Sequence, residues 1–168
     1  MKELKSIDYQ ILSELLKNSR RSDRTLAKVV KTSQPTFTRR RTKLEKDFLC
    51  GYTAIPKWKR LGFEIIAFTL VRSNVKYANA KKRQLALSKL RKWFAKQPDV
   101  VFAAEGVGAG QDGIFISIHK SYSDFAEFME RHNSELSAFL IESQTIIVST
   151  NPTAIIKPFH FKYLANAK

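Results

Sequence analysis

The segment 33–46 concentrates side chains that bind nucleic acids. On a helix, its outward positions carry hydroxyl, amide and guanidinium groups, which hydrogen-bond base edges and phosphate oxygens. Ser33, at the start of the segment, is also a candidate DNA-binding residue. The side chains expected to reach base edges are Gln34, Thr36, Arg39 and Arg40, and those expected to bind phosphates are Thr38, Thr42 and Lys43. These residue types at this spacing predict a helix that reads DNA.

The first residues of this segment predict where the helix begins. Ser33 is a frequent capping residue that accepts from amides of the first turn, and Pro35 is tolerated there because its missing amide costs nothing. The inward stripe at helical spacing consists of Phe37, Arg41, Leu44 and Phe48. Since Arg41 interrupts an apolar stripe, its guanidinium needs a partner, either Asp8 or Asp47, or it must reach a phosphate.

Two amphipathic segments precede this helix. Residues 6–18 place Ile7, Ile11, Leu12, Leu15 and Leu16 at helical spacing, with Ser6 as the expected cap and Asp8 in the first turn. Residues 22–31 place Leu26, Ala27, Val29 and Val30 behind the capping residue Ser22. Because almost no connection separates this second helix from the basic third one, the pair predicts a helix-turn-helix.

A basic cluster follows the third helix. Residues 48–62 contain Tyr52, Thr53 and Ile55, then the breaker Pro56, and are predicted to form a β-hairpin wing. The basic side chains near its tip, expected to contact the DNA backbone, are Lys57, Lys59 and Arg60. Residues 1–62 are therefore predicted to form a winged helix-turn-helix domain.

The net charge of +15 indicates an acidic partner. Residues 1–62 carry 16 Lys and Arg against 6 Asp and Glu, whereas residues 63–168 carry 14 against 9. Solubility needs a net charge of about 2 to 8 in a small domain, so the excess predicts a nucleic acid or an anionic membrane. No stretch approaches the roughly 18 apolar residues of a span and no signal-peptide core follows Met1. The expected partner is double-stranded DNA and the expected location is the cytoplasm.

The remaining sequence predicts an α+β domain over residues 63–168. Strands are expected over 63–71, 100–106, 113–119 and 142–149, helices over 81–96 and 122–139, and a polar irregular connection over 73–80. The order β-α-β-β-α-β is that of a ferredoxin-like split sandwich with two helices on one face of the sheet. The other face must be covered, which predicts a homodimer or higher homo-oligomer. The apolar tail 153–164 is expected to add a strand to the sheet or to the partner.

A glycine-rich bend, residues 106–113, separates the two middle strands. Gly108, Gly110 and Gly113 formally match a dinucleotide fingerprint, which requires a helix after the glycines. Because residues 114–119 alternate like a strand, we reject that interpretation and expect a mobile hairpin. A ligand or partner contact through this bend stays open, with Gly106, Gly108, Gly110 and Asp112 as the candidate effector-binding residues.

Enzymatic and metal chemistry is not indicated. His119, His132 and His160 lack the spacing of a metal site and are expected at the surface or in an interface. The single cysteine, Cys50, is expected to be a small core or surface thiol. The sequence therefore predicts no catalytic residue, no metal and no cofactor.

Several short motifs, in order along the chain, carry a family resemblance. They are Ile7-Asp8-Tyr9-Gln10-Ile11-Leu12, Leu26-Ala27, Ser33-Gln34-Pro35-Thr36, Arg39-Arg40, Leu44-Glu45, Gly51-Tyr52-Thr53-Ala54, Leu61-Gly62 and Val71-Arg72. Together the set resembles the leucine-responsive and asparagine-regulator group (Lrp/AsnC) of transcription regulators. The resemblance implies a sequence-specific DNA-binding regulator in which a winged helix-turn-helix is joined to a β-α-β-β-α-β effector and assembly domain, forming dimers and often dimers of dimers.

The sequence departs from the family pattern at two places, and two other functions are alternatives to a specific regulator. Arg41 stands where the family normally has Val or Ile, and the bend 106–113 is longer than the family's glycine-and-acid turn, so an amino-acid effector is not carried over. A branch of similar proteins, the sirohaem decarboxylases, offers an enzymatic alternative, which predicts a helix-turn-helix without basic contacts. A non-specific, chromatin-like DNA binder is the third hypothesis.

Overall fold

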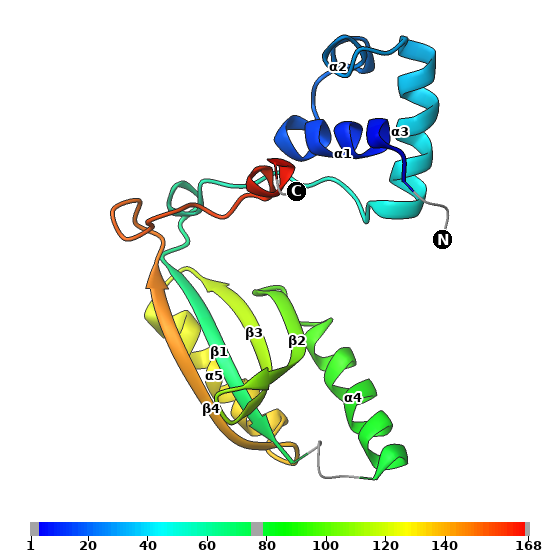
Figure 1. Cartoon of the computed structure of the whole chain (residues 1–168). Helices are drawn as coiled ribbons and strands as arrows, with labels where there is room; N and C mark the ends of the chain where they lie inside the picture. Colours follow the sequence, from blue (N-terminus) through cyan, green and yellow to red (C-terminus); the bar gives the residue numbers. More distant parts are fainter. Residues whose placement is uncertain (1–3, 75–78, 167–168) are drawn as a thin grey trace. The chain divides into compact units, whose positions relative to one another are not determined.

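The chain divides into two compact units. The computed structural model describes residues 4–74 and 79–166 (Figure 1). One unit comprises Met1–Ile55 together with Lys157–Lys168, and the other comprises Pro56–Ile156. The contacts within the chain therefore place the division after Ile55. The predicted boundary between a DNA-binding domain, 1–62, and an assembly domain, 63–168, stays a prediction. No helix within the described ranges is long and apolar enough to cross a membrane.

Three α-helices form the core of the N-terminal unit. They are α1 (Ser6–Asn18), α2 (Asp23–Val29) and α3 (Gln34–Phe48). The predicted apolar stripes meet in one core, whose buried members are Ile11, Leu15, Leu26, Ala27, Val30, Phe37 and Leu44. Phe48, predicted on the inward stripe, is instead 43% exposed because it lies in the last turn of α3, beyond the other helices' core residues. The predicted helix-turn-helix arrangement is confirmed.

The helix caps differ in part from the prediction. The Ser22 hydroxyl accepts from the Thr25 amide at 3.2 Å, as expected for a cap. At α1 the Asp8 carboxylate instead accepts from the Lys5 amide at 3.0 Å, so the expected cap at Ser6 is wrong. The Ser33 hydroxyl donates to Thr36 Oγ1 at 2.9 Å and does not cap α3, although Ser33 occupies the N-cap position.

The turn between α2 and α3 is closed without a glycine. Lys31 adopts a left-handed backbone with φ of 54°. The following amide, of Thr32, donates to the Ala27 carbonyl at 2.9 Å, which satisfies one of the unpaired carbonyls at the end of α2. A lysine can adopt this conformation at a cost of about 1 kcal/mol, which the closed turn offsets.

The predicted β-hairpin wing over 48–62 is wrong. Residues 49–57 form no strand, and Trp58–Leu61 forms a short 3-10 helix, η1. The chain then turns at Gly62, whose φ is 81°. A hairpin needs two runs that can pair, and here Pro56 removes a donor while the basic run after it closes its own local hydrogen bonds, such as Arg60 N to Lys57 O at 2.8 Å.

The second unit has the predicted ferredoxin-like order. Its strands are β1 (Ile65–Ser73), β2 (Val100–Gly108), β3 (Gln111–His119) and β4 (Leu140–Ser149), and its helices are α4 (Ala80–Phe94) and α5 (Tyr122–Glu135). The sheet is antiparallel in the order β2-β3-β1-β4 (Figure 1). Residues 75–78 of the predicted polar connection lie outside the described residues.

The two faces of this sheet differ in what covers them. On one face Phe115 is buried between Phe94 of α4 and Phe128 of α5, with ring centroids 5.4 and 5.9 Å apart. On the other face the register aligns Phe68 with Ile116 on one side and with Ile146 on the other. Ile146 is 64% exposed, so this apolar face has no cover in the described chain.

The bend between β2 and β3 is a tight two-residue turn. Ala109 and Gly110 have φ values of 49° and 74°, the pattern of a type I′ hairpin. The strands therefore run on to Gly108 and Gln111, so the expected hairpin is confirmed and the bend is shorter than the predicted 106–113. Gly113 pairs with Val71 inside the sheet, which confirms that no dinucleotide-binding helix follows the glycines.

Two histidines predicted at the surface or in an interface are fully buried in the core of the second unit. His119 lies on the helix-covered face, its Nε2 2.9 Å from the Ser117 hydroxyl. His132 lies among aromatic rings, with its centroid 5.0 Å from that of Phe115. The prediction was wrong because both residues occupy core positions of their elements. Burial lowers the pKa of both, although the Asp124 charge opposes this shift at His119.

These buried histidines predict a fold that loses stability in mild acid. Because the folded-state pKa is lowered, the unfolded chain takes up protons first as pH falls below about 6.5, and stability falls by up to about 1.4 kcal/mol per pH unit for each histidine. Urea unfolding at pH 7.5 and 5.5 measures this loss. The change should shrink in His132→Phe; a loss equal to that of the parent would contradict the assignment.

The C-terminal tail packs on α1 and adds no strand. Phe161–Asn166 forms a 3-10 helix, η3, in the N-terminal unit. The Ser13 hydroxyl of α1 donates to the Ala165 carbonyl at 2.6 Å. The expected strand over 153–164 is therefore wrong: these residues form turns and η3, and the last turn docks on the first helix.

Candidate nucleic-acid interface

The outer face of α3 exposes a basic row. Arg39, Lys43 and Lys46 are exposed and recur at four- and three-residue steps, which places them on one side of the helix. Gln34 is also exposed, and Thr36 is half-buried near the helix start. The structure thus gathers four of the predicted residues, Gln34, Thr36, Arg39 and Lys43, on the accessible part of one helix.

Lys46 is a member of this row that the sequence analysis omitted. Its position seven residues after Arg39 brings it back to the same side after two turns. The helical spacing that identified the other members contained the same signal. The omission came from ending the outward set at Lys43.

Arg40 is a structural residue of this unit. Its Nη1 lies 2.8 Å from Asp8 Oδ1, which joins α3 to α1, and its side chain is 27% exposed. Burial would raise the pKa of Asp8, but the Lys5 amide and the Arg40 guanidinium together hold it below its usual value. Because its charge is engaged by Asp8, we remove Arg40 from the predicted base-reading set.

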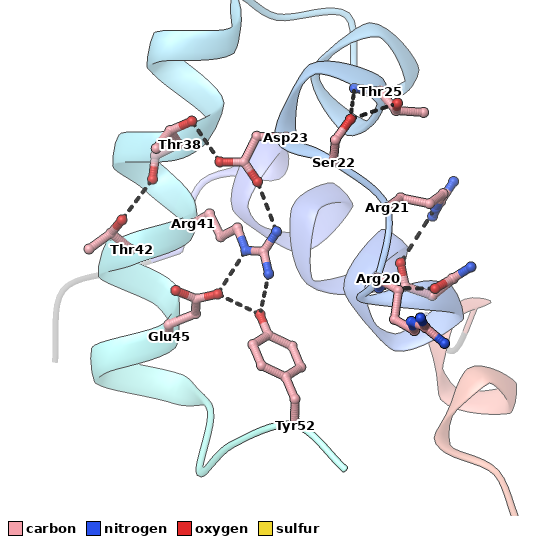
Figure 2. A network of polar contacts seen from close by, with 11 residues as sticks. Arg20, Arg21, Ser22, Asp23, Thr25, Thr38, Arg41, Thr42, Glu45 and Tyr52 are labelled. Carbon is pink, nitrogen blue, oxygen red and sulfur yellow. Dashed lines mark hydrogen bonds and ion pairs between the residues drawn. The ribbon is translucent and has the colours of Figure 1, made fainter. Parts of the chain in front are cut away.

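Arg41 is the centre of a polar network that links α3 to α2 (Figure 2). Its Nη1 lies 2.8 Å from Asp23 Oδ1 and its Nε lies 2.7 Å from Glu45 Oε1. The Tyr52 hydroxyl donates to the same Glu45 oxygen at 2.7 Å. The partners expected for Arg41, Asp8 and Asp47, were wrong, because Asp8 pairs with Arg40 and Asp23 approaches from the next helix.

Arg41 and Glu45 of this network both stay charged over the neutral range. Burial opposes the charge on Arg41, but the hydrogen bonds to Glu45 and Asp23 prevail and raise its pKa. The Tyr52 hydroxyl, followed by Arg41, lowers the pKa of Glu45. Arg41 therefore stays cationic while being held inside the domain, which accounts for an arginine in the apolar stripe.

The two threonine hydroxyls predicted to bind phosphates are already used as donors. Thr38 Oγ1 donates to Asp23 Oδ2 at 2.6 Å, and Thr42 Oγ1 donates to the Thr38 carbonyl at 3.0 Å (Figure 2). A phosphate oxygen requires a donor, so both hydroxyls would first have to leave these partners. Thr38 instead supports the position of Asp23.

The basic residues predicted in the wing lie in the other unit. Lys57, Lys59 and Arg60 are exposed at and just before η1. They belong to the compact unit Pro56–Ile156, whereas α3 belongs to the other unit. Their proposed contact with DNA stays a prediction.

A cavity of about 670 Å³ lies in the second unit between α4, α5 and the β2-β3 hairpin. Its lining is mainly apolar and includes Leu90, Phe94 and Phe115. Of the candidate effector residues, Gly106 and Asp112 line it, whereas Gly108 and Gly110 do not. The Asp112 carboxylate is already engaged, since it accepts from the Ser73 amide at 2.9 Å.

The described residues contain no candidate metal site. Within those residues no three His, Cys, Asp or Glu side chains come together as metal ligands. Cys50 is an exposed free thiol.

Comparison with known proteins defines the class of the N-terminal unit. Residues 4–45 match the model of the AsnC-type helix-turn-helix domain. An uncharacterised HTH-type transcriptional regulator of Pyrococcus abyssi is 37% identical over 76 residues, which cover 45% of this chain and 51% of that protein. The chain thus spans about half the length of this curated relative.

Solved structures extend the similarity over nearly the whole fold. AsnC of Escherichia coli matches with a TM-score of 0.70 and 22% identity, over 94% of this chain and 98% of that one. A transcriptional regulator of Neisseria meningitidis in complex with L-methionine matches with a TM-score of 0.74 and 22% identity, over 91% and 96%. The chain therefore carries an AsnC-type helix-turn-helix domain, and the resemblance to the Lrp/AsnC regulators predicted from the sequence is confirmed.

Proposed function

We propose that the protein is a sequence-specific DNA-binding transcription regulator. The observation that carries the proposal is the exposed basic row on α3 within an AsnC-type helix-turn-helix. In such motifs the second helix lies in the major groove and its early residues contact base edges. Gln34, Thr36 and Arg39 are the proposed base-reading residues, and Lys43 and Lys46 the proposed phosphate contacts.

We further propose that the regulator acts as a homodimer or higher homo-oligomer. The apolar, uncovered face of the sheet supports this, because a row of apolar residues crosses it from Phe102 on β2 through Ile116 and Phe68 to Ile146 on β4. The two ends of this row, Phe102 and Ile146, are 51% and 64% exposed. A second copy placed against this face would bury both sheets and pair two α3 helices for two half-sites. A regulator of this kind would act on DNA in a prokaryotic cytoplasm.

A small-molecule effector is part of the proposal. The apolar cavity between α4, α5 and the hairpin has a size typical of ligand sites. Arg91 is one of the lining residues, beside apolar side chains. A guanidinium together with an apolar wall suits a compact carboxylate with an apolar body. The Neisseria regulator of similar fold binds L-methionine, a molecule of that class.

The two rival functions make opposite demands on α3. An enzyme of the sirohaem-decarboxylase type would not need the basic row that α3 exposes, and the similar proteins named above are transcription regulators. A non-specific binder would use the same basic row without a preference for sequence. Competition between a selected duplex and random duplex at fixed salt separates the specific regulator from the non-specific binder.

Replacing Arg39 by Ala tests the proposed function. The binding site is first selected from random duplex with the parent protein, and affinity is then measured by gel shift on selected and random duplexes. Arg39→Ala should weaken the selected site by about 1 to 3 kcal/mol, because a bidentate base contact is lost, and should weaken random duplex less. The control Arg131→Ala removes an exposed arginine of α5 and should leave both affinities unchanged. If Arg39→Ala and Arg131→Ala had the same ratio of affinities for selected and random duplex, Arg39 would not read a base.

A further inference from the structure

Helix α4 is basic throughout, in contrast to its neighbour on the sheet. It contains six Lys and Arg and no Asp or Glu, whereas α5 contains four Asp and Glu and one Arg. Both helices cover the same face of the sheet, since rings from both contact Phe115. On a surface whose charges only maintain solubility, positive and negative side chains are interspersed. The separation of sign between the two helices points to a partner specific to α4.

Four lysines of α4 form one exposed row, here named the lysine stripe: Lys81, Lys82, Lys89 and Lys92. At 100° and 1.5 Å per residue they fall within about 100° of the helix circumference and along about 16 Å of its length. Arg83 pairs with Glu105 at 2.7 Å, but among the described residues no carboxylate lies within 4.0 Å of a stripe lysine. The stripe is therefore an uncompensated row of positive charge.

The first-turn lysines of the stripe and the spacing of the other two both destabilise α4, although the last-turn position of Lys92 is itself favourable. Lys81 and Lys82 lie in the first turn, which contains no acidic residue. Cations are unfavourable there because the helix dipole is positive at that end. Lys89 and Lys92 are three residues apart, so they repel each other on the helix surface. A bound polyanion would relieve both effects.

The surroundings of the stripe favour a nucleic acid over a membrane. A helix that lies on a membrane needs an exposed apolar face. In α4 the apolar side turns inward: Ala86 is buried and Phe94 packs on Phe115. Leu85 is the large apolar side chain that α4 exposes beside the lysines. A phosphate backbone needs no apolar face, since lysine ammonium groups bind it as point charges.

We propose that the lysine stripe binds the phosphate backbone of duplex DNA, as a second contact surface in addition to α3. The inference rests on the proposed function, because it takes DNA as the partner of the chain. It adds a contact made by the sheet domain, which is independent of sequence. Longer duplexes, with unrelated sequence beside the selected site, should then bind more tightly than the selected site alone.

The double variant K81Q/K82Q in the full-length protein tests the stripe. Affinity for a long duplex carrying the selected site is measured over a salt series. Each lost phosphate contact should flatten the slope of log K against log salt by about 0.9, so the variant should lose about two units of slope for each protomer bound. Glutamine keeps helix propensity and removes unfavourable charges from the first turn, so weaker binding would not come from unfolding of α4.

The double variant K120Q/R131Q is the matched control, since it removes two exposed charges from the same unit outside the stripe. It should keep the parent's slope. If K81Q/K82Q has the slope of this control while Arg39→Ala still loses sequence preference, the stripe inference is wrong and the proposed function stands. If the parent binds no duplex even at low salt, both proposals fall together.

Discussion

Replacing Arg41 by Met is expected to destabilise the N-terminal unit by about 2 to 3 kcal/mol. Removing one partner of a buried ion pair costs about 3 to 5 kcal/mol because the other charge is left without compensation. Here the side chains of Arg41, Asp23 and Glu45 are 18%, 22% and 34% exposed, so water reduces the cost. Methionine retains the unbranched stem, which limits the loss of packing.

The measurement is urea unfolding followed by far-UV circular dichroism at pH 7, with Arg39→Met as the control. Arg39 lies on the exposed side of the same helix and should change stability by less than about 0.5 kcal/mol. Adding D23N and E45Q to Arg41→Met should recover part of the loss, because the uncompensated carboxylates are then absent. Equal stability of the Arg41 and Arg39 variants would show that the network contributes nothing to the fold.

The network also explains how α3 is held for its proposed role. Asp23 lies at the first position of α2 and Tyr52 lies beyond the end of α3, so Arg41 connects three segments around one guanidinium. Arg40 makes a separate connection to α1 through Asp8. Two of the three successive arginines thus fix the helix, and Arg39 is left on the accessible face.

The sequence predicted the helices and strands well because their periodicity is local. The apolar spacing of residues 6–18 gave the bounds of α1, and the alternation of residues 114–119 identified β3. The caps and the wing depend on which acceptor hydrogen-bonds each backbone amide. Periodicity carries no information about that choice. The prediction placed the cap of α1 at Ser6, whereas in the structure the Asp8 carboxylate accepts from the Lys5 amide.

The candidate site was predicted only in part, for a related reason. Helical spacing identified the exposed positions of α3, but it gave no partner for an inward arginine. Asp23 is 18 residues before Arg41, and Asp8 is 32 residues before Arg40, so both pairs depend on the packing of whole helices. The histidines were misplaced similarly, because their burial depends on helices that close over the sheet.

Replacing Ile146 by Glu is expected to dissociate the proposed dimer. Ile146 lies on the apolar face of the sheet, aligned with Phe68, which in turn aligns with Ile116. A two-fold interface contains each changed residue twice, so two carboxylates would be buried without partners. Tyr122→Glu is the control, since Tyr122 is 66% exposed, compared with 64% for Ile146, but lies at the start of α5. Analytical ultracentrifugation should find monomers in the first variant and the parent's mass in the second.

Loss of the dimer should weaken binding to a paired site far more than any single contact. Two linked helix-turn-helix units gain about 10² to 10⁴ in affinity over one, because the second binds at a high effective concentration. Ile146→Glu should therefore lose about this factor on a duplex with two half-sites, and much less on a single half-site. Ile146 and α3 lie in different compact units, so the substitution should not change how a single α3 binds. An equal loss of affinity on both duplexes would therefore indicate misfolding, which a circular dichroism spectrum detects. An unchanged mass with full affinity would mean that another surface pairs the two reading helices.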